Sequence, residues 1–363
     1  MRTICAILLQ MNLNKLKTVF ADLPKFRLKQ AFKAIFNDFA ESWDEVTVFP
    51  KDLRAKLNTD FPLEIKAELI ESSDGKTIKA LVSFEDTKGA EAVLMHHSDS
   101  RNTVCVSSQI GCAMGCEFCA TGDMGFKRNL TSDEIVTQVL LFSRLLKRSG
   151  QRVTNVTFMG MGEPFLNYDE MISAAKFLNK ELGIAARHIS ISTCGIVGGI
   201  LKFMKEPFQF NLAISLHAPN NELRSKLMPV NRRFSLEKVL QAVAAYIKET
   251  NRKVMIEYLL IKDVNDSAEN AKELVKVLKK YLVNLFVVNL IPYNPTGSRP
   301  EGFANKGTFA KRTPFKFEPS SGKNIAKFKA VLEDGGIEAV QRFSFGQKIA
   351  GACGQLGTRL KNR

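Results

Sequence analysis

Short apolar stretches that alternate with amphipathic stretches restrict this chain more than any other feature. Helical patterns cover residues 131–147, which a Thr131–Glu134 capping box opens, and 169–182, 236–250 and 267–280. Strand patterns lie between them, at residues 103–108, 153–160, 188–193, 210–216, 253–261 and 285–291. Strands that alternate with helices form parallel βα units. About six such units predict an α/β fold, an open partial (β/α)6 barrel like part of a TIM barrel, with its chemistry at the carboxyl ends of the strands.

Length and hydropathy favour a protein with more than one domain and no membrane segment. The chain has 363 residues, enough for a sizeable core. No apolar run reaches the roughly 20 residues that a membrane-spanning helix needs. The apolar stretch 4–11 is short and continues into a basic segment, so we interpret it as the start of a helix and not as a signal peptide. The sequence therefore predicts a cytoplasmic protein, and we expect it to be a monomer.

The charge balance favours a polyanionic partner. The chain has 52 Lys and Arg against 37 Asp and Glu, a net charge of +15. Neutralising phosphates releases counterions, so such a surface suits a nucleic acid. A basic protein without such a partner fits the charge equally well.

Three cysteines, Cys112, Cys116 and Cys119, stand in a C-x3-C-x2-C spacing. A structural zinc site uses four ligands, usually as two separated pairs, and the chain has no second C-x2-C pair. An iron–sulfur cluster ligated only by cysteine also needs four thiolates. Three thiolates leave one iron of a [4Fe–4S] cluster open, as a reactive cluster requires. The odd total of seven cysteines argues against a disulfide framework.

A set of residues follows the predicted strands at the end where a barrel carries its chemistry. Glycines in MGMGEP (159–164) permit close approach of the backbone to a ligand, and Glu163 can accept a hydrogen bond from an ammonium group. Taken singly, each is an ordinary loop or strand-end residue. Their shared position makes them candidate ligand contacts: Gly162, Glu163, Ser192, Ser215, Leu216, His217 and Asn294.

The cysteine spacing, with Phe118 just before the last cysteine, resembles the radical S-adenosylmethionine (radical SAM) superfamily. The wider sequence resembles the RlmN/Cfr family of radical SAM RNA methyltransferases. The motifs that carry this resemblance are CVSSQIGCAMGCEFCATG, FMGMGEP, ISIST, ISLHAPN, LMPVN, IEYLLIKDVND, NLIPYNP and ACGQL. It covers nearly the whole chain, and the segment FRLKQAFKAIFNDFAESWDEVTVFPKDLRAKL looks like that family's helical accessory domain.

The resemblance implies a domain plan and a set of cofactors. We expect a small helical accessory domain at 1–62, a β-rich extension at 63–98, a radical SAM barrel at 99–345 and a C-terminal segment at 346–363 that carries a methyl-carrier cysteine. One [4Fe–4S] cluster would be bound by Cys112, Cys116 and Cys119. SAM, used twice per turnover, would contact the strand-end residues named above.

The resemblance also implies a reaction that proceeds through the protein's own cysteines. One SAM methylates Cys353. A second is reductively cleaved at the cluster, and the 5′-deoxyadenosyl radical takes a hydrogen atom from that methyl group. The methylene radical adds to adenine, a glutamate removes the ring proton, and Cys105 attacks Cys353 to release the product with a Cys105–Cys353 disulfide. The glutamate corresponds to Glu91, although the turn before Cys105 is one residue longer than usual. An exposed charge at a strand edge is the alternative for Glu91.

Two branches of the family differ in the carbon that they methylate. The GEP and HAP motifs are more like the RlmN type, which methylates adenosine C2 in 23S rRNA at the peptidyl-transferase centre and in the tRNA anticodon loop. Cfr-type methylation of adenine C8 in rRNA, which confers antibiotic resistance, is the alternative. Either branch implies RNA partners and an electron donor such as flavodoxin or ferredoxin.

Two further classes of function stay open at this point. A radical SAM enzyme for a small molecule would leave Cys105 and Cys353 idle, and a nonenzymatic iron–sulfur RNA-binding or sensor protein would not cleave SAM. The long loop 297–323 interleaves Lys306, Lys311, Arg312 and Lys316 with Phe303, Phe309, Phe315 and Phe317. That pattern suits RNA contacts and suits a flexible surface insertion equally well.

Overall fold

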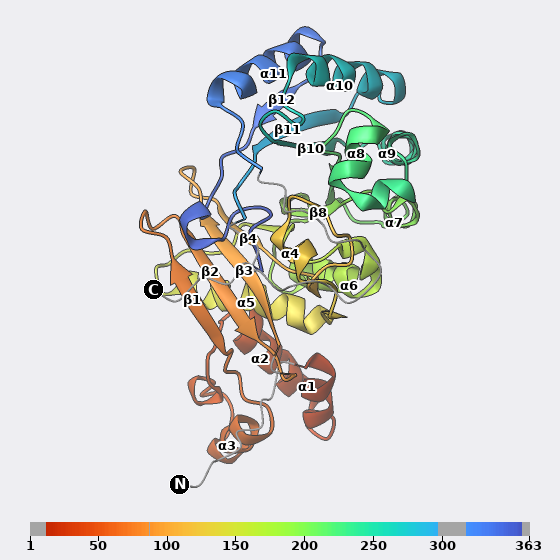
Figure 1. Cartoon of the computed structure of the whole chain (residues 1–363). Coiled ribbons are helices and arrows are strands. Elements are labelled where there is room, and N and C mark those ends of the chain that lie inside the picture. The colour runs from red at the N-terminus through yellow and green to blue at the C-terminus, as the bar shows by residue number, and fades with distance from the viewer. Residues whose placement is uncertain (1–11, 87, 297–316, 358–363) are drawn as a thin grey trace.

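The computed structural model describes residues 12–86, 88–296 and 317–357, and a single large sheet forms its centre (Figure 1). Seven adjacent strands run parallel: β4 (Asn102–Cys105), β7 (Asn155–Phe158), β8 (Ile189–Thr193), β9 (Asn211–Ser215), β10 (Val254–Leu260), β11 (Phe286–Pro292) and β12 (Ala339–Gln341). The first six confirm the strands predicted from the sequence. The seventh, β12, was not predicted, because three residues are too few to show a pattern. The apolar stretch 4–11 and most of the basic loop, 297–316, lie outside the described residues.

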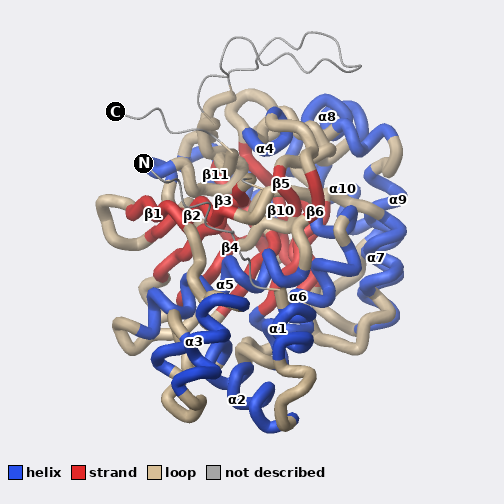
Figure 2. The backbone as a smooth tube through the Cα atoms, turned by 90° about the horizontal axis from the view of Figure 1, so that it is seen from below, coloured by secondary structure: helices blue, strands red, loops and turns tan. Residues whose placement is uncertain are grey.

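Helices lie around the strands, which occupy the middle of the molecule (Figure 2). Those of the barrel are α4 (Ala120–Asp123), α5 (Ser132–Lys147), α6 (Tyr168–Lys180), α7 (Val197–Phe203), α8 (Asn221–Leu227), α9 (Leu236–Thr250), α10 (Ala268–Tyr281) and α11 (Gly322–Asp334). The predicted capping box at the start of α5 is confirmed, since the Thr131 hydroxyl and the Glu134 carboxylate each accept a hydrogen bond from the other residue's backbone N–H. No helix in the described part of the chain is long and apolar enough to cross a membrane.

A three-stranded antiparallel meander extends the sheet on the side of β4. It consists of β1 (Ala67–Glu71), β2 (Thr77–Ser83) and β3 (Gly89–His96), and β3 pairs with β4 so that Val93 faces Cys105. A separate small ladder joins β5 (Gln109–Ile110) to β6 (Arg128–Asn129) on either side of the cysteine loop. The meander therefore places the residues around Glu91 beside the end of the strand that leads into the cysteine loop.

Three helices form a separate N-terminal layer: α1 (Leu13–Val19), α2 (Lys25–Phe36) and α3 (Lys51–Asp60) (Figure 1). Their core is aromatic, with Trp43 stacked on Phe49 at a centroid distance of 5.9 Å and Phe20 packed against both rings. The Trp43 indole N–H donates to the Phe61 carbonyl at 2.6 Å, so its polar atom is paired although the ring is fully buried.

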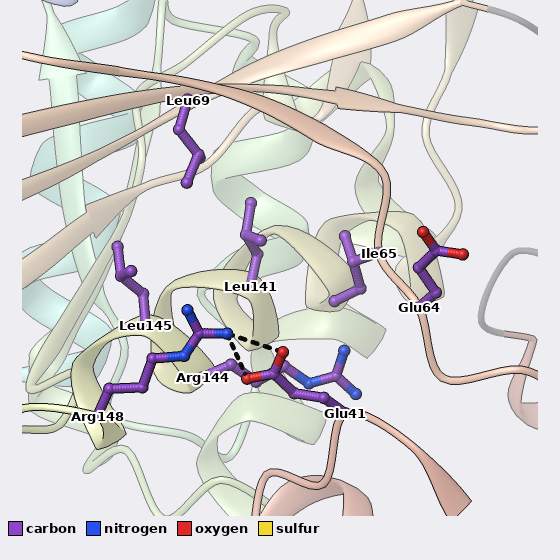
Figure 3. Close-up of a pocket in the computed structure, with 8 residues that line it drawn as sticks. All are labelled: Glu41, Glu64, Ile65, Leu69, Leu141, Arg144, Leu145 and Arg148. Atoms are coloured by element: carbon purple, nitrogen blue, oxygen red, sulfur yellow. Dashed lines mark hydrogen bonds and ion pairs between the residues drawn. The ribbon is translucent and has the colours of Figure 1, made fainter.

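Arg144, on α5, fastens this N-terminal layer to the barrel. Its buried guanidinium donates to the Ala40 carbonyl at 2.6 Å and to the Leu63 carbonyl at 2.7 Å. A cavity of about 170 Å³ lies beside it (Figure 3), where Arg148 instead makes an exposed ion pair with Glu41 at 2.8 Å. The cavity is lined by residues at the joint between the N-terminal layer and the barrel. None of its lining residues is a cysteine.

The Arg144→Gln variant tests this joint. It leaves the Ala40 and Leu63 carbonyls short of their partners in a buried place, which costs about 2–4 kcal/mol of unfolding free energy. Urea denaturation measures the loss. Arg148→Gln is the matched control and should cost much less, because the ion pair that it removes is exposed. Equal losses in both variants would contradict the role given to Arg144.

Candidate active site

The C-terminal segment, residues 346–357, lies against both the β1–β3 meander and the cysteine loop. The Ala120 N–H donates to the Gly354 carbonyl at 2.8 Å, and the Thr121 hydroxyl donates to the Leu356 carbonyl at 2.7 Å. On the opposite side the Gln355 amide donates to the Pro295 carbonyl at 2.7 Å, just beyond β11. These bonds place Cys353 between the cysteine loop and the carboxyl end of β11.

Cys353 and Cys105 are brought together although 248 positions separate their numbers in the sequence. The carbonyl of Cys353 accepts a hydrogen bond from the Asn294 side chain at 3.2 Å. Burial, then the nearby Cys105 and Cys119, raise the pKa of Cys353 to about 12, although part of the residue's surface is exposed. Burial likewise raises the pKa of Cys105 to about 11. Both groups are therefore neutral thiols at pH 7, and both are free.

Glu91 points toward the same segment. One carboxylate oxygen accepts from the Gly357 N–H at 2.9 Å, and the other lies 3.3 Å from the ammonium of Lys79. Lys79, on β2, is 4% exposed at its side chain and also donates to the Ala350 carbonyl at 3.4 Å. The Lys79–Glu91 pair thus holds the C-terminal segment on either side of Cys353. The exposed strand-edge alternative for Glu91 is wrong, because Glu91 is 9% exposed.

The three clustered cysteines lie on a tight loop, half-buried. The Cys119 N–H donates to the Cys116 carbonyl, and the Cys112 N–H donates to the Gly125 carbonyl, each at 3.2 Å. Burial raises the pKa of all three thiols, and each of Cys112 and Cys116 is raised further by Cys119. The three sulfurs therefore share one neighbourhood and one loop.

This donor set has the chemistry of an iron–sulfur ligand set. Within residues 12–86, 88–296 and 317–357, no group of three or more His, Cys, Asp and Glu side chains is placed to hold one metal ion. A [4Fe–4S] cluster takes each thiolate on a different iron. Cys112, Cys116 and Cys119 supply three soft ligands, as such a cluster prefers.

The Gly-Glu-Pro turn packs directly against the strand that precedes the cysteine loop. Gly162 has φ +102°, and a Cβ there would lie 2.6 Å from the Cβ of Gln109, so a side chain is excluded. Burial raises the pKa of Glu163, whose carboxylate accepts from the Phe165 N–H at 3.0 Å and the Cys194 N–H at 2.7 Å. The carboxylate is thereby fixed in place close to Cys112 and Cys116, which both sense its charge.

The remaining candidate contacts gather at the carboxyl ends of the strands. The hydroxyls of Ser192 and Ser215 lie 3.5 Å apart across β8 and β9. His217 follows β9 with φ 59°, and its ring meets Phe118 of the cysteine loop edge to face at 5.0 Å. Leu216 is fully buried beside it, and Asn294 is buried beyond β11. The structure therefore brings all seven predicted strand-end residues to the face that carries the cysteine loop and Cys353.

Sequence reasoning missed three buried residues of this region, the cations Lys79 and Arg224 and the thiol Cys194. Lys79 lies in a strand whose pattern shows no reason for a buried cation. The Cys194 N–H donates to Glu163, and Arg224 donates to the carbonyls of Cys194 and Ser215. These contacts join segments that are distant in the sequence, so no local pattern predicts them. The one available signal was that Cys194 comes directly after a predicted strand, as the other site residues do.

Comparison with known proteins defines first a class and then a family. The model of the radical SAM superfamily matches residues 106–289. The crystal structure of a radical SAM methyltransferase from Sphaerobacter thermophilus is similar to this chain with a TM-score of 0.86 and 41% identity, over 96% of this chain and 98% of that chain. The chain is therefore a radical SAM enzyme, a class whose members use a [4Fe–4S] cluster and SAM.

Two sequence relatives narrow the class. A protein named "Probable dual-specificity RNA methyltransferase RlmN" from Dictyoglomus thermophilum is 42% identical over 92% of this chain and 90% of its own length. A "Ribosomal RNA large subunit methyltransferase N" from Nitrosopumilus maritimus is 41% identical over 93% of both chains. The chain belongs to the RlmN family of radical SAM RNA methyltransferases.

The buried His217 makes a pH-dependent contribution to stability. Burial, then the charge of Arg224, lower its pKa from 6.5 to about 3, and its Nδ1 accepts a hydrogen bond from the Leu259 N–H at 3.0 Å. Unfolding frees the imidazole to take a proton below pH 6.5. The stabilisation is therefore complete above that pH and is lost as the pH falls toward 3.

We predict that the unfolding free energy falls by about 2 kcal/mol from this group between pH 7.5 and pH 5. His217→Asn keeps an acceptor for the Leu259 N–H and tolerates the positive φ, but it does not titrate. Denaturant titration at both pH values should show a smaller fall for His217→Asn than for the wild type by about that amount. Parallel falls in the two proteins would contradict the buried neutral imidazole.

Proposed function

We propose that this enzyme methylates C2 of adenosine in 23S rRNA, at the peptidyl-transferase centre, and in the tRNA anticodon loop. The printed names of the relatives support an RNA substrate and a dual specificity. The observation that carries the proposal is the position of Cys353, which is held next to Cys105 and Cys119 by bonds to the cysteine loop and to Asn294. A small-molecule enzyme or an iron–sulfur sensor would have no use for that pair of thiols.

The cofactors would be held at the carboxyl ends of the strands. Cys112, Cys116 and Cys119 would ligate one [4Fe–4S] cluster. SAM, two molecules per turnover, would contact Gly162, Glu163, Ser192, Ser215, Leu216, His217 and Asn294. Both Glu163 oxygens already accept backbone N–H groups, and their remaining lone pairs can accept from the methionine ammonium. When bound, cluster and SAM supply the methyl group and the means to remove a hydrogen atom from it.

The chain's own residues would carry the carbon to the RNA. The Cys353 sulfur loses its proton and takes the methyl group, and the activated carbon then bonds to adenine C2 as a thioether between protein and RNA. The adduct gives up one electron, which the bound cluster would accept, and Glu91 accepts the C2 proton. The Cys105 thiol then loses its proton and its sulfur attacks the Cys353 sulfur, so that a disulfide forms and the carbon–sulfur bond breaks. The electron pair of that bond stays on the carbon, which takes up a proton to become the methyl group, and the methylated base leaves. Each new round needs that disulfide reduced to two thiols.

Lys79 would assist Glu91 in this scheme. Its buried ammonium lies 3.3 Å from one Glu91 oxygen and so helps to hold the carboxylate that would accept the proton. Glu91 is bonded to the Gly357 N–H while the C-terminal segment is docked. Its second oxygen faces Lys79, so the base and the methyl carrier are held by the same contacts.

Several parts of the proposal rest on the sequence and on the family. The division into 1–62, 63–98, 99–345 and 346–363, a monomeric state, a cytoplasmic location and an electron donor of the flavodoxin or ferredoxin type stay predictions. The Cfr-type reaction at adenine C8 is the competing assignment, and the GEP and HAP motifs favour C2.

We predict that Cys105→Ala accumulates a covalent protein–RNA adduct, because the thioether to Cys353 then has no internal attacker. Denaturing gels with a labelled rRNA fragment should show a slow band that nuclease removes. Glu91→Gln should accumulate a similar adduct that keeps its C2 proton, and Cys353→Ala is the control that forms no adduct. Normal turnover by Cys105→Ala would exclude this thiol from the reaction.

We predict 2-methyladenosine as the product. Ribosomal RNA and tRNA from cells with and without the enzyme are digested and compared by mass spectrometry with 2-methyladenosine and 8-methyladenosine standards. The 2-methyl nucleoside should be present in both RNAs only when the enzyme is present. Predominant 8-methyladenosine would assign the chain to the Cfr-type reaction. A 2-methyladenosine found only in rRNA would remove tRNA from the substrates.

A further inference from the structure

Arg224, on α8, is a fully buried cation at the edge of the proposed site. Its Nη2 donates to the carbonyls of Cys194 at 2.7 Å and Ser215 at 3.4 Å, and its Nε donates to the Leu216 carbonyl at 3.2 Å. Its Nη1 donates to the Asn231 side chain at 2.8 Å and to the Phe234 carbonyl at 3.3 Å. Every acceptor is neutral, and the five hydrogen bonds match the five N–H groups of a guanidinium.

No carboxylate in the described part of the chain lies within ion-pair distance of this guanidinium. A buried charge with neutral partners only is unusual, because desolvation costs several kcal/mol per ion unless an opposite charge compensates for it. Arg224 therefore has its hydrogen bonds satisfied and its charge uncompensated. A negative charge that binds nearby would compensate for the desolvation of this guanidinium.

The groups that sense this charge are the thiols of Cys194 and Cys116 and the imidazole of His217. Apart from burial, the groups that act on Arg224 electrostatically are Cys194 and Cys116, and Cys116 in turn senses Arg224. The same helix touches the cysteine loop directly, since the Glu117 N–H donates to the Leu227 carbonyl at 3.0 Å. The uncompensated cation thus lies on the helix that touches the cysteine loop next to Cys116, one of the three proposed cluster ligands.

We propose that Arg224 is the fixed counter-charge of the iron–sulfur cluster and that it favours the reduced form of the cluster. This inference rests on the proposed cluster site at Cys112, Cys116 and Cys119. A four-iron cluster held by three thiolates is anionic, and one-electron reduction adds a further negative charge without a proton. A cation fixed nearby in a low-dielectric place stabilises the more negative state, which raises the reduction potential.

The full set of hydrogen bonds distinguishes this role from ligand binding. With its five N–H groups directed at protein oxygens, Arg224 has none left to donate to the carboxylate of SAM. It acts through its charge and through the Ser215–Leu216 backbone that it holds. Arg224 is accordingly a positioning residue, and the potential of the cluster reports on it.

The test is a redox titration of the reconstituted cluster, followed by electron paramagnetic resonance, with dithionite as the reductant and no SAM or RNA present. Iron content and the visible spectrum are measured first for each protein. Arg224→Gln removes the charge and should shift the reduction equilibrium at least tenfold toward the oxidised cluster, a fall in midpoint potential of about 59 mV or more for one electron. Arg224→Lys keeps the charge and should show less than half of that shift.

Two further variants separate charge from folding. Arg144→Gln removes another buried guanidinium that donates to carbonyls, but at the joint with the N-terminal helices, and should destabilise the protein without moving the potential. If Arg224→Gln does not fold, Asn231→Asp replaces a neutral acceptor of Arg224 by a carboxylate, and the potential should fall because the cation is then neutralised.

The outcomes separate the inference from the function on which it depends. A wild-type protein that binds no cluster would overturn the proposed function, and this inference with it. A full cluster whose potential is the same in Arg224→Gln, or in Asn231→Asp where that variant replaces it, would overturn the inference alone. So would an equal shift in Arg144→Gln, because the effect would then follow stability and not charge.

Discussion

The hydrogen bond from the Ala120 N–H to the Gly354 carbonyl joins the two parts of the chain that carry the reactive sulfurs. Together with the hydrogen bonds of Asn294 to Cys353 and of Gly357 to Glu91, it keeps the C-terminal segment against the cysteine loop, β3 and the residues that follow β11. Without this docking, Cys353 would be a thiol on a free tail. With it, the methyl carrier, the resolving thiol and the base proposed above occupy one neighbourhood.

Burial shifts the pKa values of the titratable groups in this neighbourhood. It raises the pKa of the thiols and of Glu163, and it lowers that of His217, so each of them is biased toward its neutral form. Binding of an anionic cluster and its ligands would change that balance, and the buried cation of Arg224 is already in place for it. The site is therefore arranged for charges that the polypeptide alone does not contain.

The sequence was most informative where the determinants are local. The helix at 236–250 has the predicted bounds, and the capping box at Thr131 forms as predicted, because periodicity and caps depend on neighbouring residues. The candidate site could be named because a spaced motif and strand ends define it. Lys79, Arg224 and the orientation of Glu91 depend instead on strand register and on packing between distant segments, which no local pattern encodes. The short strand β12 was missed for want of length.

The docked C-terminal segment can be tested directly by disulfide mapping. The anaerobic protein is treated briefly with diamide after its iron is removed by a chelator, then digested without reduction, and its peptides are identified by mass spectrometry. We predict that the Cys105–Cys353 peptide is the main cross-link of Cys353, since these two thiols lie together. A Cys353 that pairs mainly with cysteines of other molecules, or that stays free while other pairs form, would contradict it.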